Sequence, residues 1–349
     1  MKIKLFLCTM GLLMMASILT FCKTDIKERE TVNEANDDGD FLFCVKDDNG
    51  KYGFIDKSGQ VVIPCNWKGA GNFSEGLACV ENDNDKWGFI DKSGQVVISC
   101  DWKKVGAFFE GLACVHDAND KYGFIDKSGQ VVVECKWKDV WNFSEGLACV
   151  QDANDKYGFI DKSGQVVIPC KWKNARSFSE GLGCVQDTND KYGFIDKSGQ
   201  VVIPCKWKNA QSFSEGLARV QDTNDYYGFI DKSGQLVIPC EWKEVEYFSE
   251  GLARVSDFFI DKTGELVIWT HWKNVGAFSE GLARVVDDNW KFGFIDKSRQ
   301  VVIPCKWEDA GPFSKGLAVV QDDNGKYGVI DKTGQVIIPC KWNSISIEE

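Results

Sequence analysis

Thirteen regularly placed cysteines are the residues of this sequence with the most obvious capacity for chemistry. The chain has 15 cysteines, of which Cys8 and Cys22 fall in the N-terminal segment. Thiols can form disulfides, bind metals or pack as small side chains. The other cysteines form two columns with a spacing of mostly 35 residues: Cys44, Cys79, Cys114, Cys149 and Cys184 in the first, and Cys65, Cys100, Cys135, Cys170, Cys205, Cys240, Cys305 and Cys340 in the second.

Disulfides between the two columns are one interpretation, since an exported chain can form them. A separation of 21 residues pairs the whole first column: Cys44–Cys65, Cys79–Cys100, Cys114–Cys135, Cys149–Cys170 and Cys184–Cys205. It leaves Cys240, Cys305 and Cys340 single, because their copies carry Arg or Val in the first column. These three unpaired cysteines favour the other interpretation, in which all thirteen are semi-buried free thiols that were retained when the repeat was duplicated.

Metal and cofactor chemistry has little support. The chain has no CxxC motif, and its only histidines are His116 and His271. Asp-rich stretches such as ENDNDKWG and QDTNDKYG offer oxygen ligands to Ca²⁺, but they lack the EF-hand spacing. Asp and Asn are ordinary turn residues, so we expect hairpin turns there. We predict no metal and no cofactor.

Catalytic motifs are also missing from the sequence. It has no nucleophile elbow and no phosphate-binding loop. The Asp of the repeated FID motif, such as Asp56, has no repeated base beside it. We therefore predict a protein that is not an enzyme.

The regular placement of the cysteines follows from internal repetition of the sequence. The stretch KYGFIDKSGQVVIPCKW (191–207) recurs with small changes along the chain. A Trp follows each VVIPC run, and the nine copies are marked by Trp67, Trp102, Trp137, Trp172, Trp207, Trp242, Trp272, Trp307 and Trp342. The spacing is 35 residues, except for 30 residues between Trp242 and Trp272. Such a period is the signature of a repeat architecture.

Each copy contains three short segments rich in Val, Ile and aromatic residues, as in 51–56, 60–64 and 76–80. Their composition and length predict strands, and the Asx-rich and DKSG connections predict tight turns. The segment NWKGAGNFSEG (66–76) reads as a connection to the next copy. We predict an all-β fold of tandem three-stranded antiparallel meanders.

A unit of 35 residues is too small to fold alone, so its aromatic side chains must be buried against the neighbouring copy. We predict an elongated or superhelical array, with a closed propeller-like ring as the alternative. The copy at 255–264 has lost five residues at a hairpin tip, which argues against a regular ring. The Gly of each Tyr-Gly or Trp-Gly pair suggests that an aromatic side chain packs over it. Arg299 replaces a turn Gly, and we expect backbone strain there.

Variation between copies marks one column in particular. In the GLACV motif the Cys of the first column becomes Arg219, Arg254, Arg284 and Val319 in later copies. A position that accepts Arg is not a sealed core position. We predict that Ala and Val face the core, and that this column faces solvent or a groove. If these positions form one exposed patch, they favour binding; if they are scattered, they favour a spacer.

The N-terminal segment predicts export. Lys2 and Lys4 precede an apolar run from Leu5 to Phe21, which is typical of a signal peptide (1–21). The end of this run resembles a bacterial lipoprotein signal, which implies acylation of Cys22; another secretory signal or an uncleaved anchor are the alternatives. The polar residues that follow, up to residue 40, predict a disordered tether.

The pattern FSEGLAxV…KWGFIDKSGQVVIP resembles the bacterial WG-repeat family, which is named for a Trp-Gly or Tyr-Gly dipeptide. The Trp form stands at Trp87-Gly88, and the likeness covers about 41–349. The resemblance implies a β-repeat array, commonly in exported or surface proteins, and no defined activity.

A net charge of −11 gives no electrostatic support for nucleic-acid binding. We predict a non-catalytic exported protein, anchored to the membrane by a lipid, that presents an extended surface to a protein or glycan partner at the cell envelope. The alternative is a structural spacer for envelope maintenance without a specific ligand.

Overall fold

The computed structural model describes residues 41–256, 258–269 and 271–347. The chain divides into two units, Met1–Asp38 and Gly39–Glu349, and every described residue lies in the second. The predicted signal peptide, the predicted acylation site Cys22 and the predicted tether lie outside the described residues. Within the described part, no helix is long and apolar enough to span a membrane.

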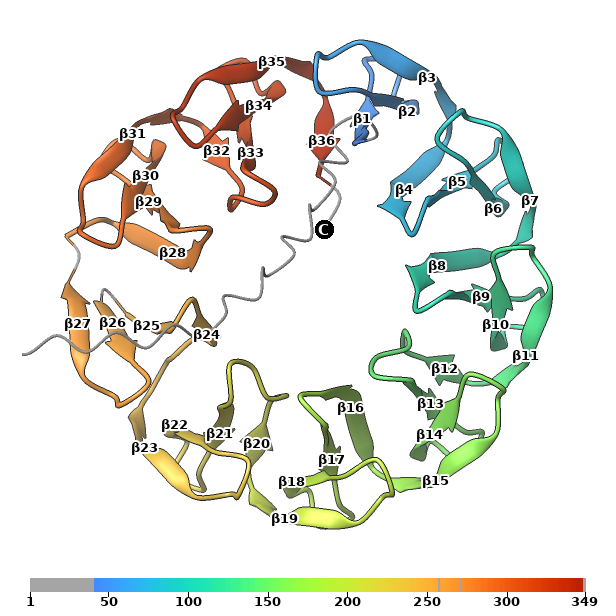
Figure 1. Cartoon of the computed structure of the whole chain (residues 1–349), viewed down its shortest axis with the longest axis vertical. Coiled ribbons are helices and arrows are strands. Elements are labelled where there is room, and N and C mark those ends of the chain that lie inside the picture. The colour runs from blue at the N-terminus through green and yellow to red at the C-terminus, as the bar shows by residue number, and fades with distance from the viewer. Residues whose placement is uncertain (1–40, 257, 270, 348–349) are drawn as a thin grey trace, which may run out of the picture. The chain divides into compact units, whose positions relative to one another are not determined.

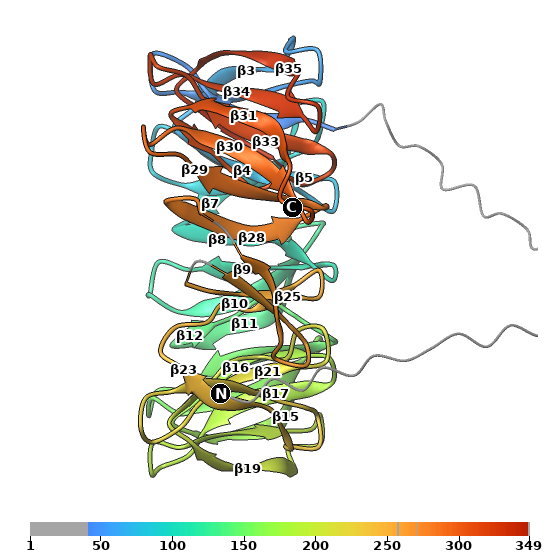
Figure 2. The ribbon, with the colours of Figure 1, turned by 90° about the vertical axis from the view of Figure 1, so that its left-hand side faces the viewer.

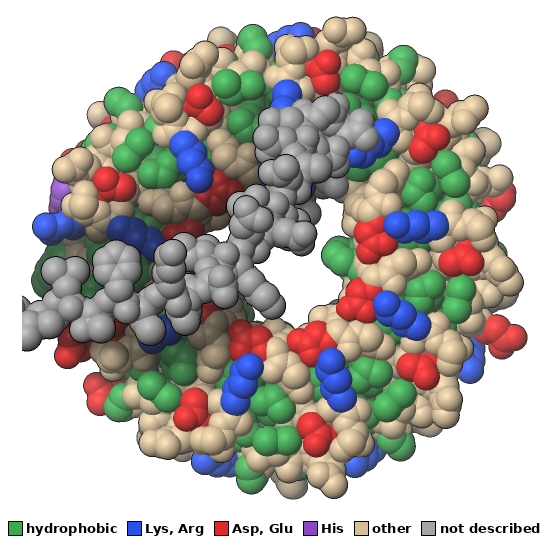
Figure 3. All heavy atoms as spheres, viewed as in Figure 1, with side chains coloured by type: hydrophobic (Ala, Val, Ile, Leu, Met, Phe, Trp, Pro, Cys, Tyr) green, Lys and Arg blue, Asp and Glu red, His purple; other side chains and the backbone are tan. Residues whose placement is uncertain are grey.

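The described residues form nine four-stranded antiparallel sheets, arranged as blades around a central opening (Figures 1 and 3). Figure 2 shows the blades edge-on, with the strands running across the thickness of the ring. The strands of each blade are named from the innermost to the outermost.

Blade 1 consists of β36 (Ser344–Ser346), β1 (Phe43–Lys46), β2 (Tyr52–Ile55) and β3 (Val61–Trp67). Blade 2 consists of β4 (Gly69–Ser74), β5 (Leu77–Glu81), β6 (Trp87–Ile90) and β7 (Val96–Trp102). Blade 3 consists of β8 (Lys104–Phe109), β9 (Leu112–His116), β10 (Tyr122–Asp126) and β11 (Val131–Trp137). Blade 4 consists of β12 (Asp139–Val140), β13 (Leu147–Gln151), β14 (Tyr157–Asp161) and β15 (Val166–Trp172). Blade 5 consists of β16 (Asn174–Ser179), β17 (Leu182–Gln186), β18 (Tyr192–Ile195) and β19 (Val201–Trp207).

Blade 6 consists of β20 (Asn209–Ala210), β21 (Ala218–Gln221), β22 (Tyr227–Ile230) and β23 (Leu236–Trp242). Blade 7 consists of β24 (Phe248–Ser249), β25 (Leu252–Val255), β26 (Phe258–Asp261) and β27 (Leu266–Trp269). Blade 8 consists of β28 (Asn274–Ser279), β29 (Leu282–Val286), β30 (Phe292–Asp296) and β31 (Val301–Trp307). Blade 9 consists of β32 (Asp309–Ala310), β33 (Leu317–Gln321), β34 (Tyr327–Asp331) and β35 (Val336–Trp342).

The prediction of an all-β fold is confirmed, but each unit has four strands instead of three. The fourth is the innermost strand, and it is formed by the segment that the sequence predicts as a connection; in blade 2 it is β4. Its register with β5 is irregular between Ala70 and Phe73, which hides the two-residue alternation that normally reveals a strand.

The ring is closed, so the predicted elongated array is wrong and its propeller-like alternative is confirmed. The last strand, β36, pairs antiparallel with the first, β1, and Val45 lies opposite Ile345. The five-residue deletion does not interrupt the ring. It shortens the turn between β25 and β26 and removes the last residue pair of this hairpin, so that Phe258 pairs with Val255 where other copies have Gly, but blade 7 keeps four strands.

The core lies between blades, as predicted from the size of the repeat. The Phe of a third strand packs against the Phe of the next blade's innermost segment, as in Phe159 and Phe178, whose ring centroids are 4.9 Å apart. Both side chains are fully buried. The aromatic residues of neighbouring copies therefore shield one another from water.

The interface between blades 9 and 1, which we call the seam, has its own residues. Its buried cluster is Phe43, Val45, Ile55, Val329, Ile338, Trp342 and Ile345. Val329 stands where other third strands have Phe, and Phe43 stands where other second strands have Ala or Gly. The exchange moves the large ring from one side of the interface to the other, so the seam remains filled.

Close backbone approach explains the glycine of each aromatic-Gly pair. A Cβ added at Gly158 would lie 2.5 Å from the Ile168 carbonyl oxygen and 2.8 Å from the Cys170 nitrogen. The predicted aromatic neighbour is therefore wrong, because the backbone of the outermost strand occupies this space, at a bulge in the pairing.

The turn at Arg299 is strained, as expected. Its φ is 70°, while Gly59 at the equivalent position of another copy has a φ of 80°. A non-glycine residue in the left-handed region costs about 1–2 kcal/mol.

An ion pair links each of blades 2–8 to the blade that follows it, and we call this pair a clamp. In one clamp the Glu145 carboxylate of blade 4 accepts a hydrogen bond from the Gly181 N–H of blade 5, and lies 3.1 Å from Lys197 Nζ. Lys197 also donates to the Glu145 carbonyl oxygen. Figure 3 shows acidic and basic side chains in adjacent pairs around the opening. At the seam, Lys315 replaces the Glu, and its ammonium group lies 5.0 Å from the Phe41 ring centroid.

Acid is expected to weaken the ring through these clamps. Burial opposes ionisation of Glu145, but hydrogen bonds from Lys197 and Gly181 outweigh it and hold the pKa below its ordinary value of 4.5. The same holds for Glu180, Glu215 and Glu280. A carboxyl group with a lowered folded-state pKa contributes stability above its unfolded pKa, and this is lost as the pH falls through the folded value. Denaturant unfolding measured at decreasing pH should therefore show a falling midpoint below about pH 4.5, less steeply in Glu145→Gln. A midpoint independent of pH would contradict this.

Candidate functional site

The cysteines of the first column lie between blades. Cys44, Cys149 and Cys184 are buried, and the Cys149 thiol lies 3.8 Å from the carbonyl oxygen of Ala175 in the next blade. Burial raises the pKa of the Cys44 and Cys184 thiols to about 12 and that of Cys170, in the second column, to about 11. Thiolate is the reactive form, so these groups are poor nucleophiles at neutral pH.

The structure does not bring the five proposed disulfide pairs together, and all thirteen described cysteines are free thiols. Cys44 lies on β1 and Cys65 on β3, with β2 between them. Two strand spacings separate Cα atoms by roughly 9–10 Å, whereas a disulfide requires less than about 7 Å. The two side chains also pack against opposite neighbours, blade 2 and blade 9.

Alkylation should distinguish the two states of the cysteines. We expect the folded protein to react slowly with iodoacetamide at neutral pH, because burial keeps the thiols protonated. After denaturation without reductant, mass spectrometry should show all thirteen labelled. First-column thiols should react more slowly than those of the second column, which are less buried. Thiols that are labelled only after reduction would establish disulfides instead.

The Arg members of the first column line grooves between blades. Arg219 donates to the Val245 carbonyl oxygen of the next blade at 2.5 Å, and Arg284 donates to the Ala310 carbonyl oxygen at 2.6 Å. Arg254 forms an ion pair with Glu246. The column therefore lies between blades around the ring and does not form one exposed patch, so this column by itself favours the spacer. Ala and Val on either side of the column are buried, as predicted, and the column members Cys79, Cys114, Arg219, Arg254, Arg284 and Val319 are half-buried, whereas Cys44, Cys149 and Cys184 are fully buried between blades.

The Asp-rich turns bind their own backbone. Asp152 Oδ1 accepts hydrogen bonds from the N–H groups of Asn154 and Lys156, at 2.8 and 2.9 Å. In the residues that the structure describes, no group of three or more His, Cys, Asp or Glu side chains is arranged to hold a metal ion.

Variation that the sequence reasoning missed is concentrated in the innermost segment of each blade, on the innermost strand or directly beside it. Four and five residues after each Trp marker stand two residues that we call the inner pair: Gly71-Asn72, Gly106-Ala107, Trp141-Asn142, Arg176-Ser177, Gln211-Ser212, Glu246-Tyr247, Gly276-Ala277, Gly311-Pro312 and Ser346-Ile347. Blades 4–7 carry large side chains at the first of these positions, whereas blades 2, 3, 8 and 9 carry Gly. Comparing the copies position by position would have revealed this contrast.

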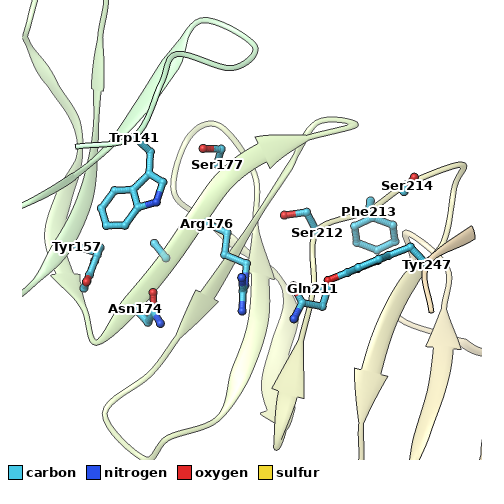
Figure 4. Close-up of a pocket in the computed structure, with 11 residues that line it drawn as sticks. Trp141, Tyr157, Asn174, Arg176, Ser177, Gln211, Ser212, Phe213, Ser214 and Tyr247 are labelled. Atoms are coloured by element: carbon cyan, nitrogen blue, oxygen red, sulfur yellow. The ribbon is translucent and has the colours of Figure 1, made fainter. Parts of the chain in front are cut away.

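Three of these large side chains, Trp141, Arg176 and Gln211, line a pocket of about 590 Å³, whereas Glu246 lies outside it. It is lined by Trp141, Tyr157, Asn174, Ala175, Arg176, Ser177, Gln211, Ser212, Phe213, Ser214 and Tyr247. Figure 4 shows Trp141 and Tyr157 at one end, Tyr247 at the other, and Arg176 and Gln211 between them. The volume falls in the range of small-molecule sites.

Neighbouring rings and charges hold the two ends of this pocket in place. Trp141 packs against Tyr157, with centroids 5.5 Å apart. The guanidinium of Arg219 lies 4.6 Å from the centroid of Tyr247. Tyr247 is nevertheless 46% exposed, so much of its ring is accessible.

Arg176 gives the pocket a positive charge. Within the described residues it forms no ion pair, its Nε is buried without a hydrogen-bond partner, and no acidic side chain lines the pocket. It lies close to Cys184, where its charge partly opposes the rise in thiol pKa caused by burial. A basic pocket in a chain of net charge −11 favours an anionic or strongly polar ligand.

Comparison with known families gives one match over nearly the whole ring. A family model described as a WG containing repeat matches residues 52–86, 87–120, 122–157, 157–192, 192–226, 227–257, 258–289, 292–327 and 327–348. No curated protein matches the chain.

Solved structures similar to this chain share little sequence with it. The computationally designed Ika8 protein is 13% identical, with a TM-score of 0.39, over 78% of this chain and 87% of its own. BamB from Moraxella catarrhalis is 9% identical, with a TM-score of 0.44, over 75% and 94%. Hsv2 from Kluyveromyces lactis is 10% identical, with a TM-score of 0.37, over 74% and 90%.

Proposed function

This chain belongs to the family of WG-containing repeats, and from that premise we propose that it is a non-catalytic interaction scaffold of the bacterial cell envelope, which binds its partner at the inner pairs of blades 4–7. The family itself brings no activity. The proposal rests on the pocket formed where nearly identical copies differ most.

The observation that carries this function is the distribution of side chains around the ring. A copy that serves only to fill the ring can carry Gly at the first position of the inner pair, as Gly71 and Gly276 show. Trp141, Arg176 and Gln211 are not needed for the same fold, and they lie side by side in one pocket. Trp and Arg are also among the residues that contribute most to binding energy at interfaces.

A triple variant tests this function in the full chain. Trp141→Gly, Arg176→Gly and Gln211→Gly together restore the residue found in other copies, so the ring should fold as before. Envelope extracts should contain a molecule that the wild-type protein retains and the triple variant does not. Equal retention by both proteins would contradict binding at this pocket, and no retention by either would favour the structural spacer.

The proposed location of the protein at the cell envelope is tested separately, through the lipid anchor. Palmitate labelling of the wild-type chain and of Cys22→Ser should show incorporation only in the former. Absence of label in both would remove the lipid anchor from the proposal and leave the pocket unaffected.

A further inference from the structure

We propose that the pocket of blades 4–7 is a saccharide site, and that its ligand is a sugar bearing a carboxylate, of the uronic acid class. This inference rests on the proposed function and specifies its ligand. It is argued from the side chains that line the pocket.

The aromatic ends of the pocket suit sugar rings. The C–H face of a pyranose is apolar while its edge is polar, so it packs on an aromatic face and offers its hydroxyl groups sideways. Trp141 and Tyr247 lie at opposite ends of the pocket, and each is held by a neighbouring side chain. Such pre-organised rings lose little conformational entropy on binding.

The space between these ends is rich in uncharged hydrogen-bonding groups. They are contributed by Asn174, Ser177, Gln211, Ser212 and Ser214. Hydroxyl and amide side chains can donate and accept at the same time, as sugar hydroxyl groups do. Several such groups in one pocket match a ligand with many hydroxyl groups.

Arg176 supplies the charge. Its guanidinium presents N–H donors in a planar fork that fits a carboxylate, and no protein carboxylate lines the pocket to occupy it. A neutral sugar would leave this charge uncompensated on binding. A uronate would pair with Arg176 while its ring stacks on one of the aromatic ends.

An acidic peptide fits the pocket less well. Peptide anchors are usually buried in desolvated apolar pockets. Ala175 is the one aliphatic side chain among the residues that line this pocket, and Phe213 is itself 1% exposed. The lining therefore offers little apolar depth for an anchoring side chain.

Calorimetry on the full chain tests the ligand class with three probes of defined composition: a galacturonic acid trimer, the same trimer with its carboxyl groups reduced to alcohols, and triglutamate. The galacturonic acid trimer should bind most tightly. Arg176→Gly should weaken its binding about tenfold or more, which corresponds to about 1.4 kcal/mol, and should change binding of the reduced trimer little. Trp141→Gly should weaken both trimers.

Arg299→Gly is the matched control. It removes the same charge and also restores a residue common in other copies, but it lies in blade 8 outside the pocket. Binding should be unchanged in this variant, and circular dichroism should show all variants folded.

Three results would overturn the inference. Binding of triglutamate that is as tight as binding of the acidic trimer, with the same dependence on Arg176, would make the site a peptide site. Equal loss in Arg176→Gly and Arg299→Gly would show an effect of net charge alone. If no trimer binds while the pocket variant still abolishes retention from envelope extracts, the saccharide inference fails and the proposed scaffold function stands.

Discussion

Ile345→Asp is expected to lower the free energy of unfolding by about 3–5 kcal/mol, because it would bury an unpaired carboxylate in the seam. Ile345 is 8% exposed and lies opposite Val45 in the pairing of β36 with β1. The strand has only three residues, Ser344–Ser346, so few other contacts can compensate. Urea unfolding measures the loss, and hydrogen exchange should show that β1 loses protection first.

Val336→Asp is the control for this variant. It introduces the same charge in the same part of the chain, at a side chain that is 41% exposed on β35. A surface substitution of this kind usually changes stability by about 0.5 kcal/mol or less. An equal loss of stability in both variants would show that the pairing of β36 with β1 does not stabilise the ring.

Gly158→Ala is expected to cost about 3 kcal/mol, which is at the upper end for an added methyl group in a packed interior. The new Cβ would lie 2.5 Å from a backbone oxygen, so a whole strand would have to move instead of one flexible side chain. Thermal and denaturant unfolding should both show the loss, and exchange of β14 and β15 amides should increase.

Gly276→Ala makes the comparison specific. It is the same substitution, but the nearest atom to the added Cβ is Arg284 Cβ at 3.7 Å, an ordinary contact. This variant should be neutral or more stable by about 0.4–1 kcal/mol, because alanine restricts the unfolded chain. Equal losses at Gly158 and Gly276 would refute the close-approach explanation.

The repeat period and most strands could be predicted because they depend on local composition. Val, Ile and aromatic residues alternate with Asx and Gly turns, and each turn residue has a local reason. Gly59, for example, has a φ of 80°, as its place in the DKSG turn suggested. The packing of aromatic residues between copies also followed from the size of one unit.

Closure could not be predicted in the same way, because it depends on a small rotation between neighbouring blades summed around the ring. No single residue encodes that rotation. The pairing of Ser346 with Cys44, at opposite ends of the described sequence, becomes visible only when the ring is complete. The exchange between Val329 and Phe43 likewise has a meaning only once the two are known to be neighbours.

The candidate site was missed because its residues were assigned to a connection. Irregular pairing and the frequent Gly conceal the innermost strand, and the most conspicuous variation in the sequence, from Cys to Arg, lies in a column between blades. Trp141, Arg176 and Gln211 occupy one position in three successive copies. The sequence shows that these three residues differ from the Gly of other copies, but only the ring structure shows that they lie close together.

The separate residues of the seam have a consequence for how such rings evolve. The interfaces other than the seam share one set of contacts. A duplicated 35-residue copy inserted within the array would therefore pack against both of its neighbours through these same contacts. Phe43 and Val329 would still meet, since they lie at the two outer ends of the duplicated region. The circumference would grow by one unit and the angle between adjacent blades would decrease. Unequal recombination could thereby adjust the curvature of a binding face in discrete steps, while the closing residues stayed as they are.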